Sequence, residues 1–150
     1  MRQAVARGLL FLATLWWGAW FGGQLFNALM VVPHFSSAPP QSLLAWGAMR
    51  RHFVADFFVV CNSLWILLLL FAAIVLGRGR RRWTIVSALC AAVSFGALLW
   101  MVPTISGVLT RGGPLRDLEM WTTANWGRLA VELAGFGCAL AALASREEMR

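Results

Sequence analysis

The stretch Trp121–Ala144, WTTANWGRLAVELAGFGCALAALA, decides the fold because it combines the length of a membrane span with charged side chains. As a helix rising about 1.5 Å per residue, it crosses the roughly 30 Å hydrocarbon core of a bilayer. Asn125, Arg128 and Glu132 fall in one sector of that helix. A charged group inside the bilayer costs roughly 3 kcal/mol or more unless it faces protein or water. The sequence therefore predicts an inward-facing polar surface that other helices must meet.

Two interpretations of this polar surface are open. In the simpler one, Arg128 and Glu132 form an internal ion pair that only fixes helix packing. In the other, Asn125, Arg128 and Glu132 form a ligand-binding or reaction site. Trp126 lies beside them and could stack on a planar ligand, although anchoring at the membrane interface explains it equally well.

The composition of the whole chain is that of an integral membrane protein. Its 150 residues are 60% hydrophobic and 13% charged, with a mean hydropathy of +0.71, whereas about 25% of a soluble domain is charged. The net charge of +7 does not indicate nucleic-acid binding, because the arginines lie in short loops and tails between apolar segments. Cys61, Cys90 and Cys138 lie singly in separate apolar segments and predict no disulfide framework.

Four apolar segments predict the architecture. The expected membrane helices are residues 8–32, 52–76, 83–107 and 121–144, and Pro33 is expected to end the first of them. Residues 41–49 have helical spacing and predict a short amphipathic helix on the membrane surface. Four spans with short connections predict an all-α fold, an integral membrane antiparallel four-helix bundle that forms one domain over residues 1–150.

The distribution of arginine predicts the orientation of the bundle. One side carries Arg2, Arg7, Arg78, Arg80, Arg81, Arg82, Arg146 and Arg150, and the other carries Arg50, Arg51, Arg111 and Arg116. Since cytoplasmic loops are enriched in basic residues, we expect both termini and the middle loop in the cytoplasm. The chain has no lysine, which is typical of a GC-rich genome, and we expect a multi-pass protein of the bacterial inner membrane.

The polar side chains of the spans predict a cavity. They occur late in the outgoing spans and early in the ingoing spans, and therefore gather in the outer half of the bundle: Gln24, Asn27, His52, Asp56, Asn62, Thr104, Asn125, Arg128 and Glu132. This clustering predicts a polar cavity that opens toward the outer face above an apolar floor. The alternative is a satisfied hydrogen-bond network that only specifies helix register.

The two histidines have several possible roles. His52 and Asp56 are either a helix-start pair or a general base oriented by a carboxylate. His34 and His52 are weak candidates for metal or haem ligands, with Asp56 and Glu132 completing the set, although His34 also fits an ordinary interfacial loop residue. We predict no cofactor and keep a metal or haem as an alternative.

Three motifs carry a family resemblance. They are Asn27-Ala-Leu-Met-Val-Val-Pro33-His34 at the end of the first span, Val102-Pro103-Thr104 in the third, and Trp121-x-x-x-Asn125-Trp126-x-Arg128 opening the fourth. With these motifs the chain resembles the anthrone oxygenase-like (noranthrone monooxygenase) family of small four-span membrane proteins. Thr104-Ile105-Ser106 replaces the polar residues that follow this proline in the family. The resemblance implies a four-helix bundle and, from the fungal members, oxidation of an anthrone to an anthraquinone by dioxygen.

The function expected from these residues is that of a membrane-embedded oxygenase or other redox enzyme acting on a hydrophobic aromatic or quinone-like substrate. The candidate catalytic residues are His52, Asp56, Arg128 and Glu132, and the candidate substrate-binding residues are Gln24, Asn27, Asn62, Thr104, Asn125 and Trp126. The expected partners are membrane lipids and the hydrophobic substrate, with a homo-oligomer as an option and no nucleic acid. The alternatives are a non-enzymatic protein that binds a lipid or another hydrophobic molecule, a subunit of a larger membrane complex, or a metal- or haem-binding membrane protein.

Overall fold

The computed structural model describes residues 2–49, 54–76, 78–111 and 114–145, except the side chains of residues 2, 35, 49, 54–62, 109 and 110. Within these ranges all regular structure is helical and no strand occurs, which confirms the predicted all-α class. The elements are α1 (Arg2–Phe26), the π-helical segment η1 (Asn27–Val31), α2 (Val32–Phe35), α3 (Gln41–Met49), α4 (Val54–Val75), α5 (Arg78–Arg111) and α6 (Leu115–Ala144).

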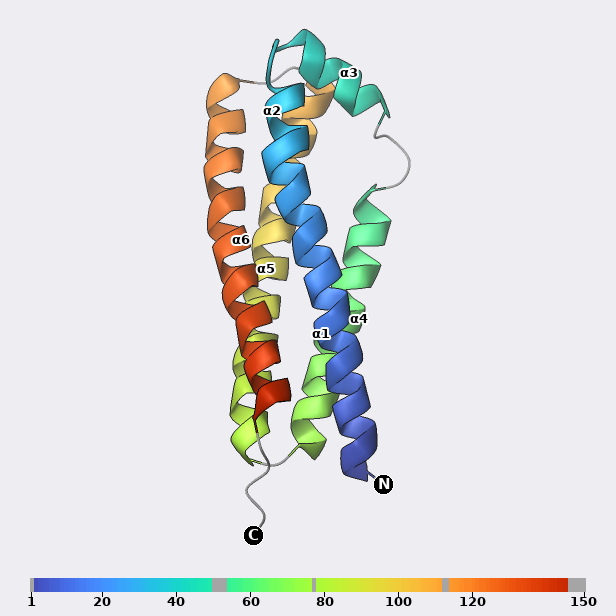
Figure 1. Ribbon diagram of the computed structural model, residues 1–150. Coiled ribbons are helices and arrows are strands. Elements are labelled where there is room, and N and C mark those ends of the chain that lie inside the picture. The colour runs from blue at the N-terminus through green and yellow to red at the C-terminus, as the bar shows by residue number, and fades with distance from the viewer. Residues whose placement is uncertain (1, 50–53, 77, 112–113, 146–150) are drawn as a thin grey trace.

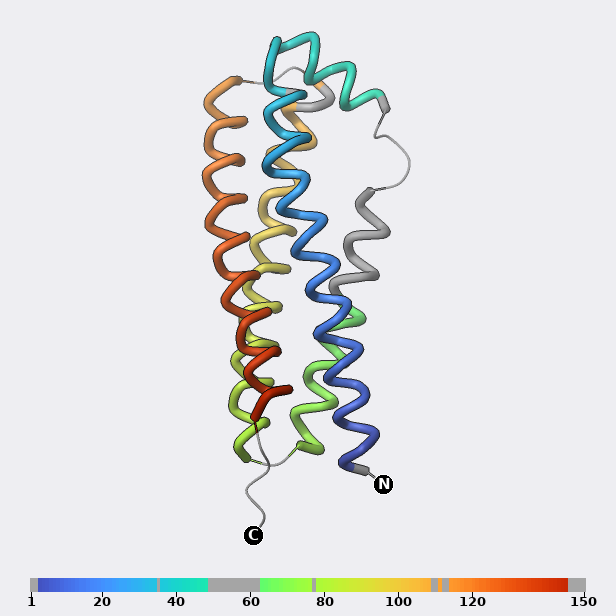
Figure 2. Tube along the Cα trace, viewed as in Figure 1, coloured from blue at the N-terminus to red at the C-terminus, as the bar shows by residue number. Residues whose placement is uncertain are grey.

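The four long helices lie side by side, and α3 lies across one end of them (Figure 1). Helix α1 packs against α4 and α6, and α5 packs against the same two helices from the other side. The start of α1, the end of α6 and the junction between α4 and α5 share the end opposite α3 (Figure 2). We call this the basic end, because its segments carry Arg7, Arg78 and Arg80–Arg82.

The helices carry the signature of a membrane protein. Among the described residues, three segments are long and apolar enough to cross a bilayer: Gln3–His34, Arg78–Val108 and Leu115–Ala144. Helix α4 contributes a shorter apolar stretch, Ser63–Val75. Large apolar side chains on the outer surfaces are more than half exposed, including Leu15, Ile74, Leu89 and Leu133. In water such a surface would be unstable, whereas lipid tails solvate it.

Pro33 does not end the first helix, contrary to the prediction. The backbone changes to π-helical geometry over Asn27–Val31, where the N–H of Val32 bonds to the carbonyl of Asn27. Pro33 then occupies the first turn of α2, where its missing N–H is tolerated. The helix ends only at Phe35, after which Ser36 Oγ donates to the carbonyl of Val32 at 2.6 Å.

The predicted short helix at residues 41–49 is confirmed as α3. Its Leu43 is fully buried, and Trp46 packs beside it against the end of the bundle. With them, α3 and the ends of α2, α5 and α6 form an outer apolar cluster, made of Val32, Leu43, Met101, Val108, Leu118 and Trp121. Helix α3 therefore covers the outer end of the helices with apolar side chains.

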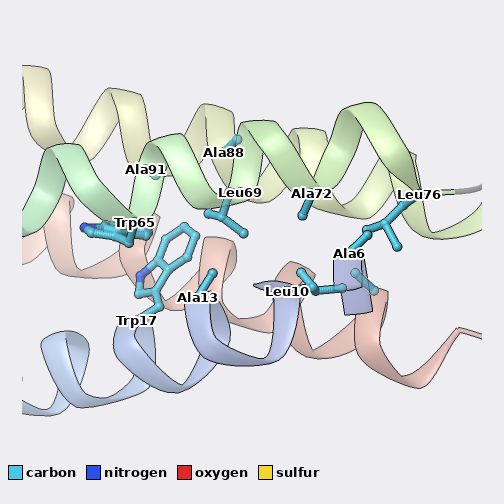
Figure 3. Close-up of a cluster of buried hydrophobic side chains, with 11 residues drawn as sticks. Ala6, Leu10, Ala13, Trp17, Trp65, Leu69, Ala72, Leu76, Ala88 and Ala91 are labelled. Carbon is cyan, nitrogen blue, oxygen red and sulfur yellow. The ribbon is translucent and has the colours of Figure 1, made fainter. Parts of the chain in front are cut away.

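A second apolar cluster fills the half of the molecule near the basic end (Figure 3). We call it the inner apolar cluster; it consists of Ala6, Leu10, Ala13, Trp17, Trp65, Leu69, Ala72, Leu76, Ala88, Ala91 and Ala142. At the end of the cluster opposite Ala6 and Leu76 (Figure 3), the rings of Trp17 and Trp65 meet edge to face, with centroids 4.0 Å apart and an interplanar angle of 62°. Small alanines surround the two indoles, so that α1 and α4 approach closely enough for ring contact.

Buried polar side chains also occur in this inner half, where the sequence predicted almost none. Thr14 and Thr84 donate to the carbonyl oxygens four residues earlier, at 2.7 and 2.9 Å. Ser87 donates to the carbonyl of Gly135 at 3.0 Å and so joins α5 to α6. Each hydroxyl finds a backbone acceptor, which makes its burial in an apolar environment tolerable.

Gly135 allows the close approach of three helices and provides a first prediction. A Cβ atom at this position would overlap the indole of Trp17 and lie 2.7 Å from Cys90 Cβ. Gly135→Ala should therefore lower the free energy of unfolding by about 1–3 kcal/mol, the usual cost of overpacking a core. SDS titration of the protein in mixed micelles measures this change.

Gly137→Ala is the matched control, because nothing lies within 4 Å of a Cβ at this exposed position of the same helix. Alanine is the better helix former, so this variant should be as stable as wild type or slightly more stable. Equal stability of both variants would contradict the packing of Trp17 on Gly135.

Candidate functional site

A cluster of buried polar side chains lies between the two apolar clusters. It is formed by Trp20 and Gln24 of α1, Ser94 of α5, and Asn125, Arg128 and Glu132 of α6, and we call it the polar cluster. The exposed fractions are 8% for Gln24, 3% for Asn125, 4% for Arg128 and 0% for Glu132. Burial of charge to this degree in a membrane protein marks a site with a specific role in folding or function.

Arg128 is the hub of the polar cluster. Its Nη1 donates to Glu132 Oε1 at 2.6 Å, and its Nη2 donates to Gln24 Oε1 at 2.8 Å. Asn125 Oδ1 accepts from Nη2 at 3.0 Å and from Nε at 3.3 Å. The guanidinium is thus held by one carboxylate and two amide oxygens, in charge-assisted hydrogen bonds that fix its orientation. The predicted interior position of Arg128, with a partner on another helix, agrees with these contacts.

Glu132 has two very different carboxylate oxygens. Oε1 accepts three hydrogen bonds, from Arg128 Nη1 and from Ser94 Oγ at 2.6 Å each, and from Trp20 Nε1 at 3.3 Å. Oε2 is buried and has no hydrogen-bond partner among the described residues. A buried carboxylate oxygen without a donor costs free energy. The polar cluster therefore offers one strong acceptor that the protein's described side chains do not use.

Regular helical spacing brings these residues together. On α6 the buried face runs through Leu118, Trp121, Asn125, Arg128, Glu132, Gly135, Ala139 and Ala142, in steps of three and four residues. The facing rows are Trp17, Trp20 and Gln24 on α1, continued by Ala28 in η1, and Ser87, Ala91, Ser94 and Met101 on α5. Such steps keep one face of a long helix against its neighbours. The polar residues occupy the same level of three adjacent rows.

Among the described residues, apolar side chains flank the polar cluster on both sides along the helices. It lies between Trp17 of α1 and Val32 of α2, between Ala91 and Met101 of α5, and between Trp121 and Ala142 of α6. Each of these flanking residues belongs to an apolar cluster. Leu43 of α3 and Trp121 are buried on the outer side of the polar cluster, and the long Arg128 side chain joins α6 to α1 through Gln24.

Three predicted binding residues lie apart from the polar cluster. Trp126 is 44% exposed on the outer surface of α6, because it falls outside the buried row. Thr104 lines a separate pocket near the outer end of α5. Asn27 is half-buried in η1 and has no part in the cluster's hydrogen bonds, as far as the structure describes them. Asn27 follows Gln24 by three residues, so its side chain lies about 60° to one side of the buried row, which continues at Ala28.

The histidine hypotheses gain no geometric support. His34 is exposed on α2, away from the buried carboxylate of Glu132. His52 lies outside the described residues, and Asp56 and Asn62 belong to α4 but their side chains lie outside the description. Among the described residues, no three His, Cys, Asp or Glu side chains gather as a metal site would require.

Sequence reasoning missed Trp20 and Ser94. Both donate to Glu132 Oε1, at 3.3 and 2.6 Å, yet neither looks exceptional in an apolar span. A signal was present in the spacing. Ser94 follows Ser87 by seven residues, and Trp20 precedes Gln24 by four, so each shares a helical face with another buried polar residue.

The chemistry available at the polar cluster follows from its charges. Glu132 can accept a hydrogen bond or a proton at Oε2, and Arg128 supplies a fixed positive charge close to it. Among the described hydrogen bonds, Gln24 and Asn125 take part through their side-chain oxygens. Their amide N–H groups are donors that a polar atom of a ligand can use.

No protein-family model, curated protein or solved structure matches this chain.

Proposed function

We propose that the chain is a four-span protein of the bacterial inner membrane, an antiparallel four-helix bundle with both termini and the α4–α5 junction in the cytoplasm. Two observations support this. Helix α4 packs against α1 and α5, and its 22 residues are about 33 Å long at 1.5 Å per residue, which suits a bilayer crossing. The segments at the basic end carry Arg7, Arg78 and Arg80–Arg82, and cytoplasmic ends are typically arginine-rich.

Cysteine labelling in intact cells tests this orientation. In a background without Cys61, Cys90 and Cys138, we expect a membrane-impermeant maleimide to label Ser37→Cys but not Gly79→Cys, since both positions are exposed at opposite ends of the molecule. Labelling of position 79 from outside, with position 37 protected, would reverse the topology.

We propose further that the protein is an oxidoreductase that oxidises a flat, hydrophobic aromatic molecule with an enolisable or phenolic group, using dioxygen. The observation that supports this is the second oxygen of Glu132, a buried carboxylate oxygen that has no donor among the described residues and lies next to a fixed guanidinium. A base and a cation held together in an apolar, water-excluding interior can remove a proton and stabilise the resulting oxyanion. The resemblance to the anthrone oxygenase-like family agrees with this chemistry.

An anthrone illustrates the proposed reaction, and its atoms balance. Glu132 Oε2 removes a proton from the substrate methylene, and the negative charge moves onto the carbonyl oxygen, where Arg128 and the amide of Asn125 stabilise it. The enolate transfers one electron to dioxygen, and the carbon radical combines with superoxide to form a C–O bond. Glu132 returns the proton to the peroxide. Loss of water then breaks the O–O bond and leaves a carbonyl, so that one oxygen atom enters the quinone and the other leaves as water.

Oxygen consumption by the purified protein tests this proposal. Glu132→Gln should lower the rate of anthrone oxidation by about a hundredfold or more, the usual contribution of a general base. Glu119→Gln is the matched control, because it removes an exposed carboxylate from the same helix, and it should leave the rate unchanged. Thermal unfolding confirms that both variants are folded.

The proposal is wrong if the wild-type protein oxidises no member of a panel of anthrones and quinols faster than buffer. If the wild type is active and a folded Glu132→Gln variant matches it, Glu132 is not the base.

A second candidate function is the binding of a hydrophobic molecule without chemistry. It is favoured by the hydrogen bonds of Arg128, which already joins Gln24, Asn125 and Glu132. Such a protein would take up a hydroxylated aromatic at Glu132 Oε2 but would consume no oxygen. Equilibrium binding of the same anthrone panel, measured alongside oxygen consumption, separates the two functions.

A further inference from the structure

A second polar site lies near the outer end of α5 and α6, apart from the polar cluster. It is a half-open pocket of about 280 Å³ lined by Pro103, Thr104, Gly107, Arg111, Pro114, Asp117 and Met120. Pockets for drug-sized ligands usually measure about 300–1,000 Å³. This pocket is just below that range, and the charges of Arg111 and Asp117 in its lining suit it to a charged polar group. The flat hydrophobic substrate of the proposed oxidation is of a different kind.

Two opposite charges line the pocket without pairing with each other. Arg111 ends α5 and Asp117 lies in the first turn of α6, and among the described residues neither side chain has an ion-pair or hydrogen-bond partner. The Arg111 side chain folds back over its own helix. Its Nη2 would lie 3.0 Å from a Cβ atom if residue 107 were not glycine. Gly107 thus makes room for the guanidinium along the pocket wall, and the pocket presents a separate cation and anion.

The length of the helices sets the depth of this pocket in the membrane. Helix α5 has 34 residues, or about 50 Å at 1.5 Å per residue, against a hydrocarbon core of about 30 Å. Its ends therefore reach roughly 10 Å into the headgroup layer on each side. Arg111 is the last residue of α5 and Asp117 follows the start of α6 closely, so both charges lie at headgroup level, with Pro103 and Met120 closer to the acyl chains.

We propose that this pocket binds the headgroup of a zwitterionic membrane lipid with a primary ammonium, phosphatidylethanolamine. The lipid phosphate pairs with Arg111, the ammonium donates to the carboxylate of Asp117, and the acyl chains lie along Pro103 and Met120 on the outer surface of α5 and α6. The two charges select the headgroup together. An anionic lipid without the ammonium meets repulsion from Asp117, and a choline headgroup offers no N–H donor and is bulkier.

Native mass spectrometry of the protein released from nanodiscs tests the proposal. The nanodiscs contain equal amounts of phosphatidylethanolamine, phosphatidylcholine and phosphatidylglycerol. The wild type should retain phosphatidylethanolamine about three- to fivefold over either other lipid, the range that a solvent-accessible ion pair supplies. Asp117→Asn and Arg111→Ala should each bring this ratio close to one. Gly107→Ala keeps both charges but displaces Arg111, and should lower the ratio as well.

Arg116→Ala and Glu119→Gln are matched controls. Each removes an exposed charge that lies on the same turns of α6 as Asp117 but does not line the pocket, so both variants should keep the wild-type ratio. Equal retention of the three lipids by the wild type, or preference for phosphatidylglycerol, would overturn the proposal. So would a wild-type ratio in both Asp117→Asn and Arg111→Ala.

Discussion

Arg128→Leu should lower the free energy of unfolding by about 3 kcal/mol, the effect of removing one half of a buried ion pair. Among the described residues, the substitution leaves Glu132 with Ser94 and Trp20 as donors, and it leaves the side-chain oxygens of Gln24 and Asn125 without the guanidinium. SDS titration in mixed micelles measures the change.

A double-mutant cycle shows how much of this loss belongs to the pair. In Arg128→Leu/Glu132→Leu both charges are replaced by apolar groups, and such a protein should recover most of the wild-type stability. Arg116→Leu, an exposed arginine on the same helix, is the control and should change stability by less than about 0.5 kcal/mol. Wild-type stability of Arg128→Leu alone would mean that the polar cluster does not hold the helices together.

The same double variant distinguishes a structural role of the polar cluster from a catalytic one. If the polar cluster only holds the helices together, a folded Arg128→Leu/Glu132→Leu protein keeps the full activity of the wild type. Under the proposed oxidation, it is folded but inactive, because both the base and the cation are gone. Burial and hydrogen bonds alone fit either role, and the activity of this stable variant decides between them.

Trp17→Ala should also lower the free energy of unfolding by about 3 kcal/mol, at the low end of the range for truncating large aromatic residues in soluble cores. Trp17 is fully buried, packs on Trp65 and fills the space left by Gly135. Truncation leaves a cavity and removes many dispersion contacts. The low end applies because, inside a membrane, lipid replaces water around the separated helices, so little hydrophobic transfer energy is lost.

Two variants test this interpretation of Trp17. Trp16→Ala is the control, because its neighbouring indole is 41% exposed on the outer surface, and it should stay within about 0.5 kcal/mol of wild type. Trp17→Phe should cost less than Trp17→Ala, since Nε1 of Trp17 has no acceptor among the described residues and only volume is lost. A Trp17→Ala variant as stable as Trp16→Ala would contradict the packing described for the inner apolar cluster.

The sequence alone determined the class of the protein and the face of α6 that turns inward. Apolar length and low charge indicated membrane helices, and the cost of charge in lipid required Arg128 and Glu132 to face the protein interior. Both side chains are buried, and Gln24 and Asn125 meet them as the depth argument indicated. These inferences succeeded because helical period and the penalty for buried charge are properties of the local chain and its solvent.

Only the tertiary structure decided which partners complete the polar cluster. The hydrogen bonds from Trp20 and Ser94 to Glu132 depend on the rotation and axial offset of α1 and α5 against α6, which a sequence with few polar markers leaves undefined. Trp126 is close to Arg128 in the sequence, and Thr104 lies at a comparable predicted depth. Both side chains nevertheless point away from the cluster, because successive residues are rotated by about 100° around a helix. The outer apolar cluster depends on Leu43 of α3, packed against residues far away in the chain. Side-chain packing between distant segments set these features, and no local period encodes it.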